Sequence, residues 1–384
     1  MTDIAAVLQR AVAARPRHAS YRLQLGPGLT FDQVAALGPY LVAMASEVNQ
    51  LGRHLDRISE RNRHWRDFTL NSLTRALREV IACFPVYYRT YIGDDGFEVT
   101  ARARDYIERA VAEAKRRNPT VNVSVFDFVR DTLLLRYPPG ADEAERAERR
   151  HFVMRLQQTT GPVTAKGVED TALYLYHRLV SLNEVGADPA RYGEPAGAFH
   201  ERNGQRLLRW PESLICTSTH DTKRGEAMRA RVNVLSEVPA AWGVHVRRWR
   251  MIARRLKRMV DGHPAPDKDD EYLLYQTLVG AWPADLASEG IGPFAARVCQ
   301  YMEKAITEAK RHTSWINPNP AYDAAVHEFV TSLLAPGGPF LDAFGPFQRR
   351  VALYGVANSL AQTVLKISLF ASFPVALLER EWRP

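Results

Sequence analysis

The fold class of this chain is indicated most clearly by residues 43–84, AMASEVNQLGRHLDRISERNRHWRDFTLNSLTRALREVIACF. Apolar residues recur there at three- and four-residue spacing, which places their side chains on one face of an α-helix. The first stripe of such residues is Val48, Leu51, Leu55 and Ile58, and the second is Leu70, Leu73, Leu77 and Ile81. Pro85 ends the pattern, because proline cannot continue a helix. The stretch therefore predicts helix almost without a break.

Further helical patterns follow this stretch. Residues 100–117 are amphipathic and charged, and Ser124 stands where an N-cap residue would begin a helix over 125–136. Residues 141–158 predict another helix, which is strongly charged at its start. We therefore expect residues 43–158 to form an all-α region.

Strand patterns are few. Residues 21–25 alternate with period two, and residues 164–166 predict a short strand that leads through a loop into a helix over 172–180. The clearest buried strand is expected over Ser213–Thr219, SLICTST, which is β-branched and apolar. Helices are expected after it over 227–235, 242–260, 270–279, 293–313, 319–334 and 346–365. The expected fold class is mainly α with a few β-strands.

Composition narrows the class of protein. The chain has 384 residues, of which 46% are apolar and 24% charged, as in ordinary globular proteins and unlike disordered or collagen-like chains. The formal net charge is +8, yet the arginines are spread along the chain and mostly stand beside acids. This pattern is typical of solvated helix faces, and we expect no nucleic-acid partner.

Cysteine usage and hydropathy bear on the compartment. Cys83, Cys216 and Cys299 lie far apart in apolar contexts and without paired spacing, so we expect buried, reduced thiols and a cytoplasmic protein. The sequence has no apolar run of 18 residues, so we expect no membrane span.

The strongest candidate for chemistry is the pair His220 and Asp221, directly after the predicted strand. Barrel enzymes place reacting groups at that end of a strand. A carboxylate there can accept hydrogen bonds from two sugar hydroxyls and stabilise positive charge at an anomeric carbon, while an imidazole donates to another hydroxyl. Two other interpretations stay open: an Asp that caps the next helix, and a metal-dependent His-Asp phosphohydrolase. Lys223 and Arg224 count against a metal, because they would repel a cation.

Two other segments carry candidate sugar contacts. Gly167 permits a sharp turn, and Lys166, Glu169 and Asp170 around it form a group of one cation and two acids that could face a sugar or simply cap a helix. Trp315 stands among polar neighbours, where an indole either stacks on a sugar ring or packs between domains.

Together these segments resemble the malto-oligosyltrehalose synthase family, which belongs to the α-amylase clan of glycoside hydrolases. The resemblance extends from residue 21 to about residue 366, in the family's order. The matching stretches are residues 21–25, 84–87, 165–172, 181–186 (SLNEVG), 218–224 (STHDTKR), 270–276 (DEYLLYQ) and 312–318 (HTSWINP).

The resemblance implies a reaction and a substrate. The family converts the reducing-end α-1,4 bond of malto-oligosaccharides into an α,α-1,1 trehalosyl bond in trehalose biosynthesis, with a retaining mechanism that uses three carboxylates and no cofactor or metal. Asp221 matches the third carboxylate and His220 its neighbouring sugar ligand. The other substrate contacts implied are Lys166, Glu169, Asp170, Lys223, Arg224 and Trp315. The partner expected is a malto-oligosaccharide, and the oligomeric state stays open.

The chain also departs from the family pattern. It contains no Gly-x-Arg-x-Asp segment for the nucleophile and no matching acid/base segment, so we expect an internal deletion near residues 41–46. The expected domains are a first βα unit of the catalytic barrel (1–42), an all-α insertion region (43–158), later barrel units with helical insertions (159–366) and a divergent tail (367–384).

This organisation predicts a partial (β/α)8 barrel remnant beside the helical insertion. It also predicts a catalytically incomplete synthase, because a retaining reaction needs two carboxylates about 5 Å apart. The alternative is a non-catalytic helical remnant that binds glucan. A helical nucleic-acid-binding protein is a third, less favoured hypothesis.

Overall fold

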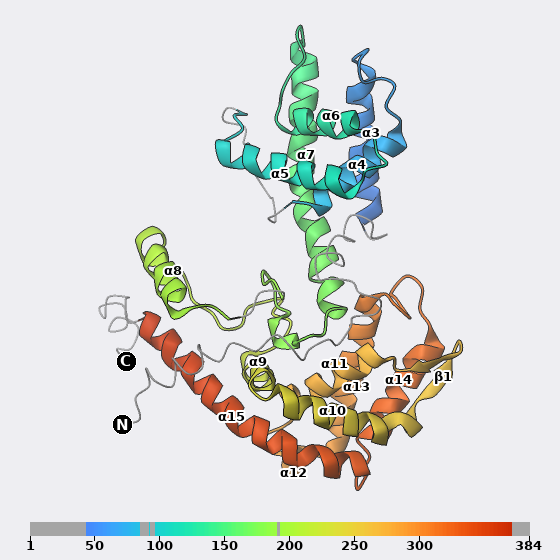
Figure 1. Cartoon of the computed structure of the whole chain (residues 1–384), viewed down its shortest axis with the longest axis vertical. Helices are drawn as coiled ribbons and strands as arrows, with labels where there is room; N and C mark the ends of the chain where they lie inside the picture. The colour runs from blue at the N-terminus through green and yellow to red at the C-terminus, as the bar shows by residue number, and fades with distance from the viewer. Residues whose placement is uncertain (1–43, 85–91, 93–96, 190–192, 371–384) are drawn as a thin grey trace, which may run out of the picture. The chain divides into compact units, whose positions relative to one another are not determined.

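The computed structural model describes residues 44–84, 92, 97–189 and 193–370 (Figure 1). Most of them are helical. They form two compact units, which we call the N-terminal unit (residues up to Ala172) and the C-terminal unit (from Leu173). The predicted βα unit over 1–42 and most of the predicted tail lie outside the described residues.

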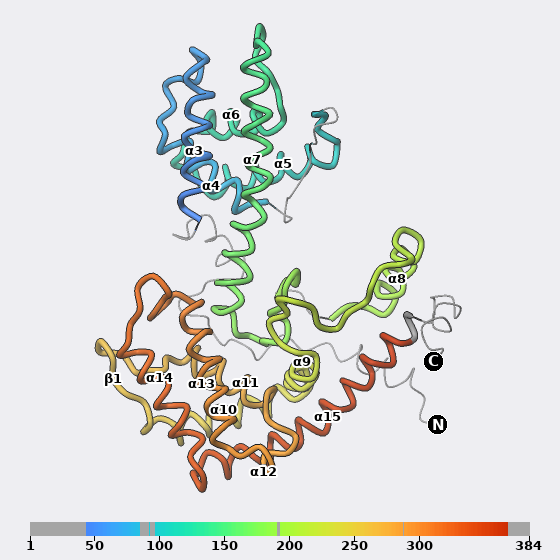
Figure 2. The backbone as a smooth tube through the Cα atoms, turned by 180° about the vertical axis from the view of Figure 1, so that it is seen from behind, coloured from blue at the N-terminus to red at the C-terminus, as the bar shows by residue number. Residues whose placement is uncertain are grey.

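The described residues of the N-terminal unit form five helices. They are α3 (Ala45–Glu60), α4 (Leu70–Ala82), α5 (Ala101–Arg117), α6 (Val123–Leu133) and α7 (Glu143–Val168). Figures 1 and 2 show α3 and α7 running side by side, with α5 and α6 across them. The apolar stripe predicted from Val48 to Ile58 is buried in its core, as is most of the second stripe.

Three local predictions in this unit are wrong. Residues 61–69 interrupt the helix with a series of turns, in which the Trp65 N–H donates to the Asn62 carbonyl (2.9 Å), and Thr69 then begins α4 by accepting a hydrogen bond from the Ser72 N–H (3.2 Å). Leu70, at that helix start, is 37% exposed. The N-cap of α6 is Asn122 rather than Ser124.

The third error concerns α7, which was expected to end at residue 158. It continues through Pro162 to Val168, so residues 164–166 are helix and not a strand. Proline removes one backbone hydrogen bond inside a helix. The buried side chains of Leu156 and Val163 on either side of Pro162 keep the same apolar face packed, which offsets that loss.

The C-terminal unit is also helical. Its helices are α8 (Ala196–Arg209), α9 (Glu226–Asn233), α10 (Pro239–Ala253), α11 (Lys268–Ala281), α12 (Leu286–Glu289), α13 (Ile291–Ala309), α14 (Pro320–Leu333) and α15 (Pro339–Phe370). Short 3-10 turns are η3 (Ala172–Tyr174, which starts in the N-terminal unit), η4 (Val180–Leu182), η5 (Val234–Ser236) and η6 (Arg254–Leu256). Aromatic side chains fill the core, with Trp249 packed against Tyr275 and Phe344.

Among the described residues, the strands are limited to one antiparallel hairpin. It pairs β1 (Arg258–Val260) with β2 (His263–Ala265), with Met259 opposite Pro264. The strand predicted over 213–219 is instead irregular and largely exposed, and none of the described residues forms a strand that pairs with it. The helix predicted over 172–180 is reduced to the turn η3. A mainly helical fold with few strands is therefore confirmed, whereas the described residues show no barrel strands.

Helix α15 has an unusual surface. No charged residue stands between Arg350 and Lys366. One side of the helix packs on α9, where Gly355 lets the backbone approach Arg231 so closely that a Cβ at residue 355 would clash. The exposed apolar face of α15 is made of Leu353, Val356, Leu360, Val364 and Ile367.

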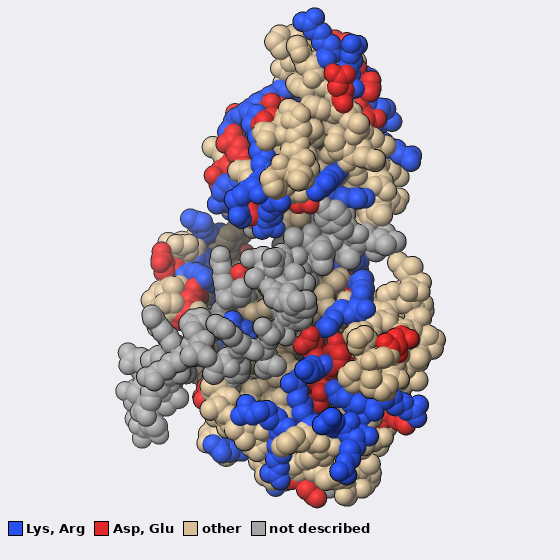
Figure 3. Space-filling view, turned by 45° about the vertical axis from the view of Figure 1, so that its right-hand side comes forward, with Lys and Arg blue, Asp and Glu red and all other residues tan. Residues whose placement is uncertain are grey.

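Charge and thiols follow simple patterns. Figure 3 shows basic and acidic side chains interleaved on the N-terminal unit, in line with ion pairs such as Arg130–Asp127 (2.6 Å).

All three cysteines are free thiols, but Cys216 is exposed, so the expectation of burial is wrong there. In the described part of the chain, no helix is both long enough and apolar enough to cross a membrane.

Candidate functional site

The predicted pair His220 and Asp221 lies on an exposed turn. The Thr219 N–H donates to Thr222 Oγ1 (2.7 Å), and the Thr222 N–H donates back to the Thr219 carbonyl (3.2 Å). Asp221 has φ +57°, in the left-handed region that Asp tolerates better than most residues. The side chain of His220 is 97% exposed and that of Asp221 is 71% exposed. The pair therefore faces water and does not follow a buried strand.

One largely covered carboxylate, that of Glu184, attaches this turn to the unit. Glu184 Oε1 accepts hydrogen bonds from the backbone N–H groups of Val185 (2.9 Å) and Lys223 (2.7 Å). Its Oε2 accepts from the Arg224 N–H (3.3 Å) and from Arg229 Nη1 (3.1 Å). The same carboxylate thus joins the SLNEVG and STHDTKR segments of the predicted motif set.

The far end of the same segment is held through Arg229. Its Nη2 donates to the Thr217 carbonyl, and the Thr217 hydroxyl donates to Glu226. Residues 217 and 224 are therefore both anchored, while the turn between them reaches into solvent. Because the sequence predicts that His220 and Asp221 contact a sugar, we call residues 217–224 the sugar-contact turn.

Beneath the sugar-contact turn lies a layer of buried polar groups. Asn183 is fully buried and donates from Nδ2 to the carbonyls of Leu173 (2.8 Å) and Tyr176 (2.5 Å). Arg224 is also buried, and its guanidinium donates to the Asn183 carbonyl (3.3 Å) and the Tyr301 hydroxyl (2.8 Å). The structure therefore places Arg224 inside the unit, while the ammonium of Lys223 lies 6.0 Å from the Tyr174 ring centre.

The DEYLLYQ segment supplies more of this polar layer from α11. Gln276 donates to the His177 carbonyl (2.7 Å) and accepts from the Val180 N–H (2.9 Å). Glu271 accepts from Lys257 Nζ (2.7 Å) and from the Tyr275 hydroxyl (2.7 Å). These motif residues are buried and paired with protein groups, so they position the chain rather than meet a substrate.

Trp315 lies on a loop that ion pairs anchor. His312 Nε2 is 2.9 Å from Asp267 Oδ2, and Arg311 pairs with both Asp267 and Asp269 at 2.8 Å. The hydrogen bond to Asp267 raises the pKa of His312. The indole itself is 63% exposed and is free to stack on a ring.

The acids beside the Trp315 loop have the spacing of metal ligands. Asp267, Asp270 and His312 each place one ligand atom within 4.8 Å of the others. However, Arg311 pairs with Asp267, and the Tyr322 hydroxyl donates to Asp270 (2.5 Å). Burial, together with the charge of Asp267, raises the pKa of Asp270 to about 6. These partners make the cluster an anchor for the loop and leave little room for a cation.

The predicted contacts Lys166, Glu169 and Asp170 lie in the N-terminal unit, at the end of α7. Lys166 Nζ pairs with Asp170 Oδ2 (2.5 Å), and the Glu169 N–H donates to the Ala165 carbonyl (2.8 Å). The sequence analysis allowed Glu169 and Asp170 to cap the start of a helix, and that placement is wrong, because both residues follow the last residue of α7. The cation of Lys166 suits the negative end of the helix dipole.

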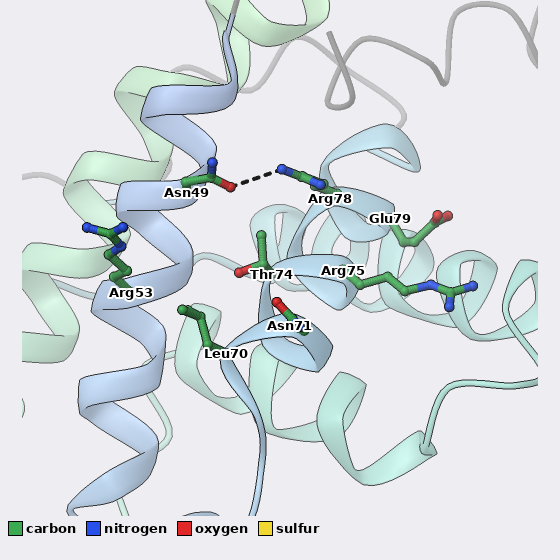
Figure 4. A pocket seen from close by; sticks show the side chains of 8 residues that line it. All are labelled: Asn49, Arg53, Leu70, Asn71, Thr74, Arg75, Arg78 and Glu79. Carbon is green, nitrogen blue, oxygen red and sulfur yellow. Dashed lines mark hydrogen bonds between the residues drawn. The ribbon is translucent and has the colours of Figure 1, made fainter. Parts of the chain in front are cut away.

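The N-terminal unit also carries a surface pocket that the sequence did not reveal. Its volume is about 660 Å³, and it lies between α3 and α4 (Figure 4). The lining residues are Asn49, Arg53, Leu70, Asn71, Thr74, Arg75, Arg78 and Glu79. Arg78 Nη2 donates to Asn49 Oδ1 (3.0 Å), whereas Arg75 extends away from α3, so the cations do not converge on one ligand position.

Comparison with known proteins places these features in a family context. No protein-family model matches the chain. A curated relative from Mycobacterium tuberculosis, named a maltooligosyl trehalose synthase, is 40% identical over 216 residues, which are 56% of this chain and 26% of the relative.

Two solved structures share the fold. The maltooligosyltrehalose synthase of Arthrobacter ramosus gives a TM-score of 0.68 at 29% identity, covering 93% of this chain and 39% of that protein. The maltooligosyl trehalose synthase of Sulfolobus tokodaii gives 0.61 at 27% identity, covering 85% of this chain and 38% of that protein. The resemblance predicted from the motifs is thus confirmed: the chain is related to maltooligosyltrehalose synthases and spans 39% or less of the length of these relatives.

Proposed function

We propose that this chain binds malto-oligosaccharides through the sugar-contact turn and does not by itself form the trehalosyl bond. The observation that carries the proposal is the joining of two motif segments by Glu184, which presents His220 and Asp221 to solvent on an anchored turn. The names and folds of the relatives support a glucan as the ligand.

The exposed side chains suit hydroxyl recognition. The Asp221 carboxylate can accept hydrogen bonds from two neighbouring hydroxyls, and His220 can donate to a third. Lys223 supplies a further donor, and Trp315 offers a ring face for stacking. Lys166, Glu169 and Asp170 stay sequence-based predictions of further sugar contacts. Arg224 supports the turn without contacting the sugar, because its guanidinium already donates to the Asn183 carbonyl and the Tyr301 hydroxyl.

Catalysis requires more than this turn supplies. A retaining reaction needs a nucleophile about 5 Å from an acid/base, and it must exclude water to favour isomerisation over hydrolysis. Asp221 is one carboxylate, it is 71% exposed, and the sequence has no Gly-x-Arg-x-Asp segment. The proposal therefore includes the predicted internal deletion near residues 41–46, which would remove the nucleophile and acid/base segments.

The proposal is tested by two measurements on the whole chain. Calorimetry with maltopentaose should show binding, and Asp221→Asn should weaken it about tenfold, since hydrogen bonds to a charged acceptor contribute about 1.5–3 kcal/mol. Glu212→Gln removes an exposed charge upstream of the turn and should leave binding unchanged. Incubation with maltopentaose should leave the amount of reducing sugar constant. Formation of non-reducing trehalosyl product would overturn the lack of catalysis, and absence of binding would overturn the binding function.

A further inference from the structure

We infer that Glu184 is the positioning residue of the sugar-contact turn, and this inference rests on the proposed function. Its carboxylate accepts four N–H groups, from Val185, Lys223, Arg224 and Arg229. The donors of Lys223 and Arg224 are backbone N–H groups at the end of the turn, and the donor of Arg229 is a guanidinium N–H on α9. The residue itself touches no exposed part of the turn, so it acts through the backbone and not on the sugar.

Burial makes this contact strong. The Glu184 side chain is only 16% exposed and its partner Arg229 only 17%. A buried carboxylate is costly unless donors surround it, and hydrogen bonds to an ionised acceptor are about twice as strong as neutral ones. Glu184 therefore holds its four donors firmly, and it fixes the positions of the backbone N–H groups of Lys223 and Arg224.

The contact reaches both ends of the turn. Lys223 and Arg224 are held directly, and Thr217 is held through Arg229, whose guanidinium contacts Glu184 and the Thr217 carbonyl. His220 and Asp221 stand between these two anchors with no burial of their own. The positions of His220 and Asp221 are therefore fixed by the side chain of Glu184, which belongs to a different segment of the chain.

Anchoring of this kind changes affinity through entropy. Ligand binding to a mobile loop includes the cost of ordering it, and a loop that is already ordered avoids that cost. Loss of Glu184 would make the turn mobile. The side chains of His220 and Asp221 would still be present, but their positions relative to each other would no longer be fixed. The expected result is weaker sugar binding without any loss of a sugar-contacting group.

The test compares Glu184→Gln and Glu184→Ala with the wild type and with Glu212→Gln. Hydrogen exchange of the Lys223 and Arg224 amides reports on the turn, and maltopentaose calorimetry reports on the sugar. We expect exchange at both amides to rise about tenfold or more in Glu184→Ala, and affinity to fall by a similar factor. Glu184→Gln keeps one acceptor oxygen, so its amide exchange and its affinity should lie between those of Glu184→Ala and the wild type. Glu212→Gln should match the wild type in both quantities.

The outcomes separate this inference from the proposed function. Unchanged amide exchange in Glu184→Ala overturns the positioning role. Faster exchange with unchanged affinity overturns its importance for sugar and leaves the proposed function standing. A wild type that binds no maltopentaose overturns both. If Glu184→Ala loses its helical circular dichroism, Arg229→Gln replaces it, and that variant should speed exchange at Thr217 and Ser218 and weaken binding in the same way.

Discussion

The helices of the N-terminal unit and the segment 173–225 of the C-terminal unit are stabilised in opposite ways. Helices α3 to α6 bury continuous apolar stripes, as Leu55 and Leu77 show. The segment 173–225 has few regular elements. It is held by the buried polar side chains of Asn183 and Gln276 and by the partly covered carboxylate of Glu184. Apolar packing is non-directional, whereas each of these polar contacts specifies two atoms at a defined distance.

This contrast indicates which parts of the molecule can present exposed functional groups. A helix packed through an apolar stripe keeps its position while its surface varies. A loop held by a few individual hydrogen bonds can present exposed groups such as His220 and Asp221 in one geometry. The loss of any one of these hydrogen bonds can then change that geometry. We therefore expect core substitutions to lower global stability and polar-anchor substitutions to alter the segment 173–225 first.

The largest effect is expected from Leu77→Ala in α4. Leu77 is fully buried, and truncation of a buried leucine costs about 2–5 kcal/mol of unfolding free energy through lost burial and a residual cavity. Chemical denaturation followed by circular dichroism measures this cost. Leu70→Ala, on the same helix but 37% exposed, is the control and should cost less than about 1 kcal/mol. Equal costs would contradict the observed break in the predicted stripe.

Gln276→Ala should have the next largest effect. It leaves the His177 carbonyl and the Val180 N–H buried without their partner, at a cost of about 2–3 kcal/mol. Hydrogen exchange should rise first at Val180, before the helices are affected. Gln205→Ala, on the exposed surface of α8, is the control and should change neither quantity. Exchange that rises evenly across the unit would show that the polar anchors act on the whole core.

Asp270→Asn tests the acid cluster through pH. Burial raises the pKa of Asp270 from 3.8 to about 6, so the folded chain binds more protons than the unfolded chain between those values. The contribution of Asp270 is therefore fully present below pH 3.8 and is lost as the pH rises through about 6. Asp270→Asn should accordingly gain about 2 kcal/mol relative to the wild type between pH 4 and 7.

Urea denaturation at several pH values between 4 and 7.5 measures that gain. The Asn side chain can still accept from the Tyr322 hydroxyl, which keeps the geometry comparable. Asp261→Asn, in the exposed turn between β1 and β2, is the control and should show no such trend. Parallel curves for Asp270→Asn and the wild type would refute the raised pKa.

The smallest effect distinguishes two caps of α6. Asn122 accepts from the Ser124 N–H (3.0 Å), so Asn122→Ala should cost about 1 kcal/mol of stability. Ser124→Ala should cost less than half of that, because the Ser124 hydroxyl only donates to Asn122 (2.9 Å). Thermal unfolding of the two variants decides the order, and the reverse order would favour the cap expected from the sequence.

Much of the helical structure could be predicted from the sequence. The buried positions of Val48, Leu51 and Ile58 follow from spacing alone, since periodicity reports directly on which face is buried. The extent of α7 could not be read in this way. Gly161 and Pro162 are local signals to stop, and only the packing of Val163 in the folded unit overrides them.

The site was predictable in part. The motif pair His220 and Asp221 is present and accessible, but its expected place after a strand depended on neighbouring strands that the described residues do not include. Glu184 was within a quoted motif, yet nothing local marks it as an anchor. Its partners lie about forty residues away in the chain, and such contacts leave no periodic trace.

The exposed apolar face of α15 has a consequence for the chain in solution. A net charge of +8 makes copies repel each other, while the uncharged stretch between Arg350 and Lys366 makes them attract. Salt weakens only the repulsion, since the screening length shortens from about 30 Å at 0.01 M to about 8 Å at 0.15 M. The osmotic second virial coefficient of this protein should therefore fall from positive toward negative as salt is added, and Leu360→Lys should delay that change.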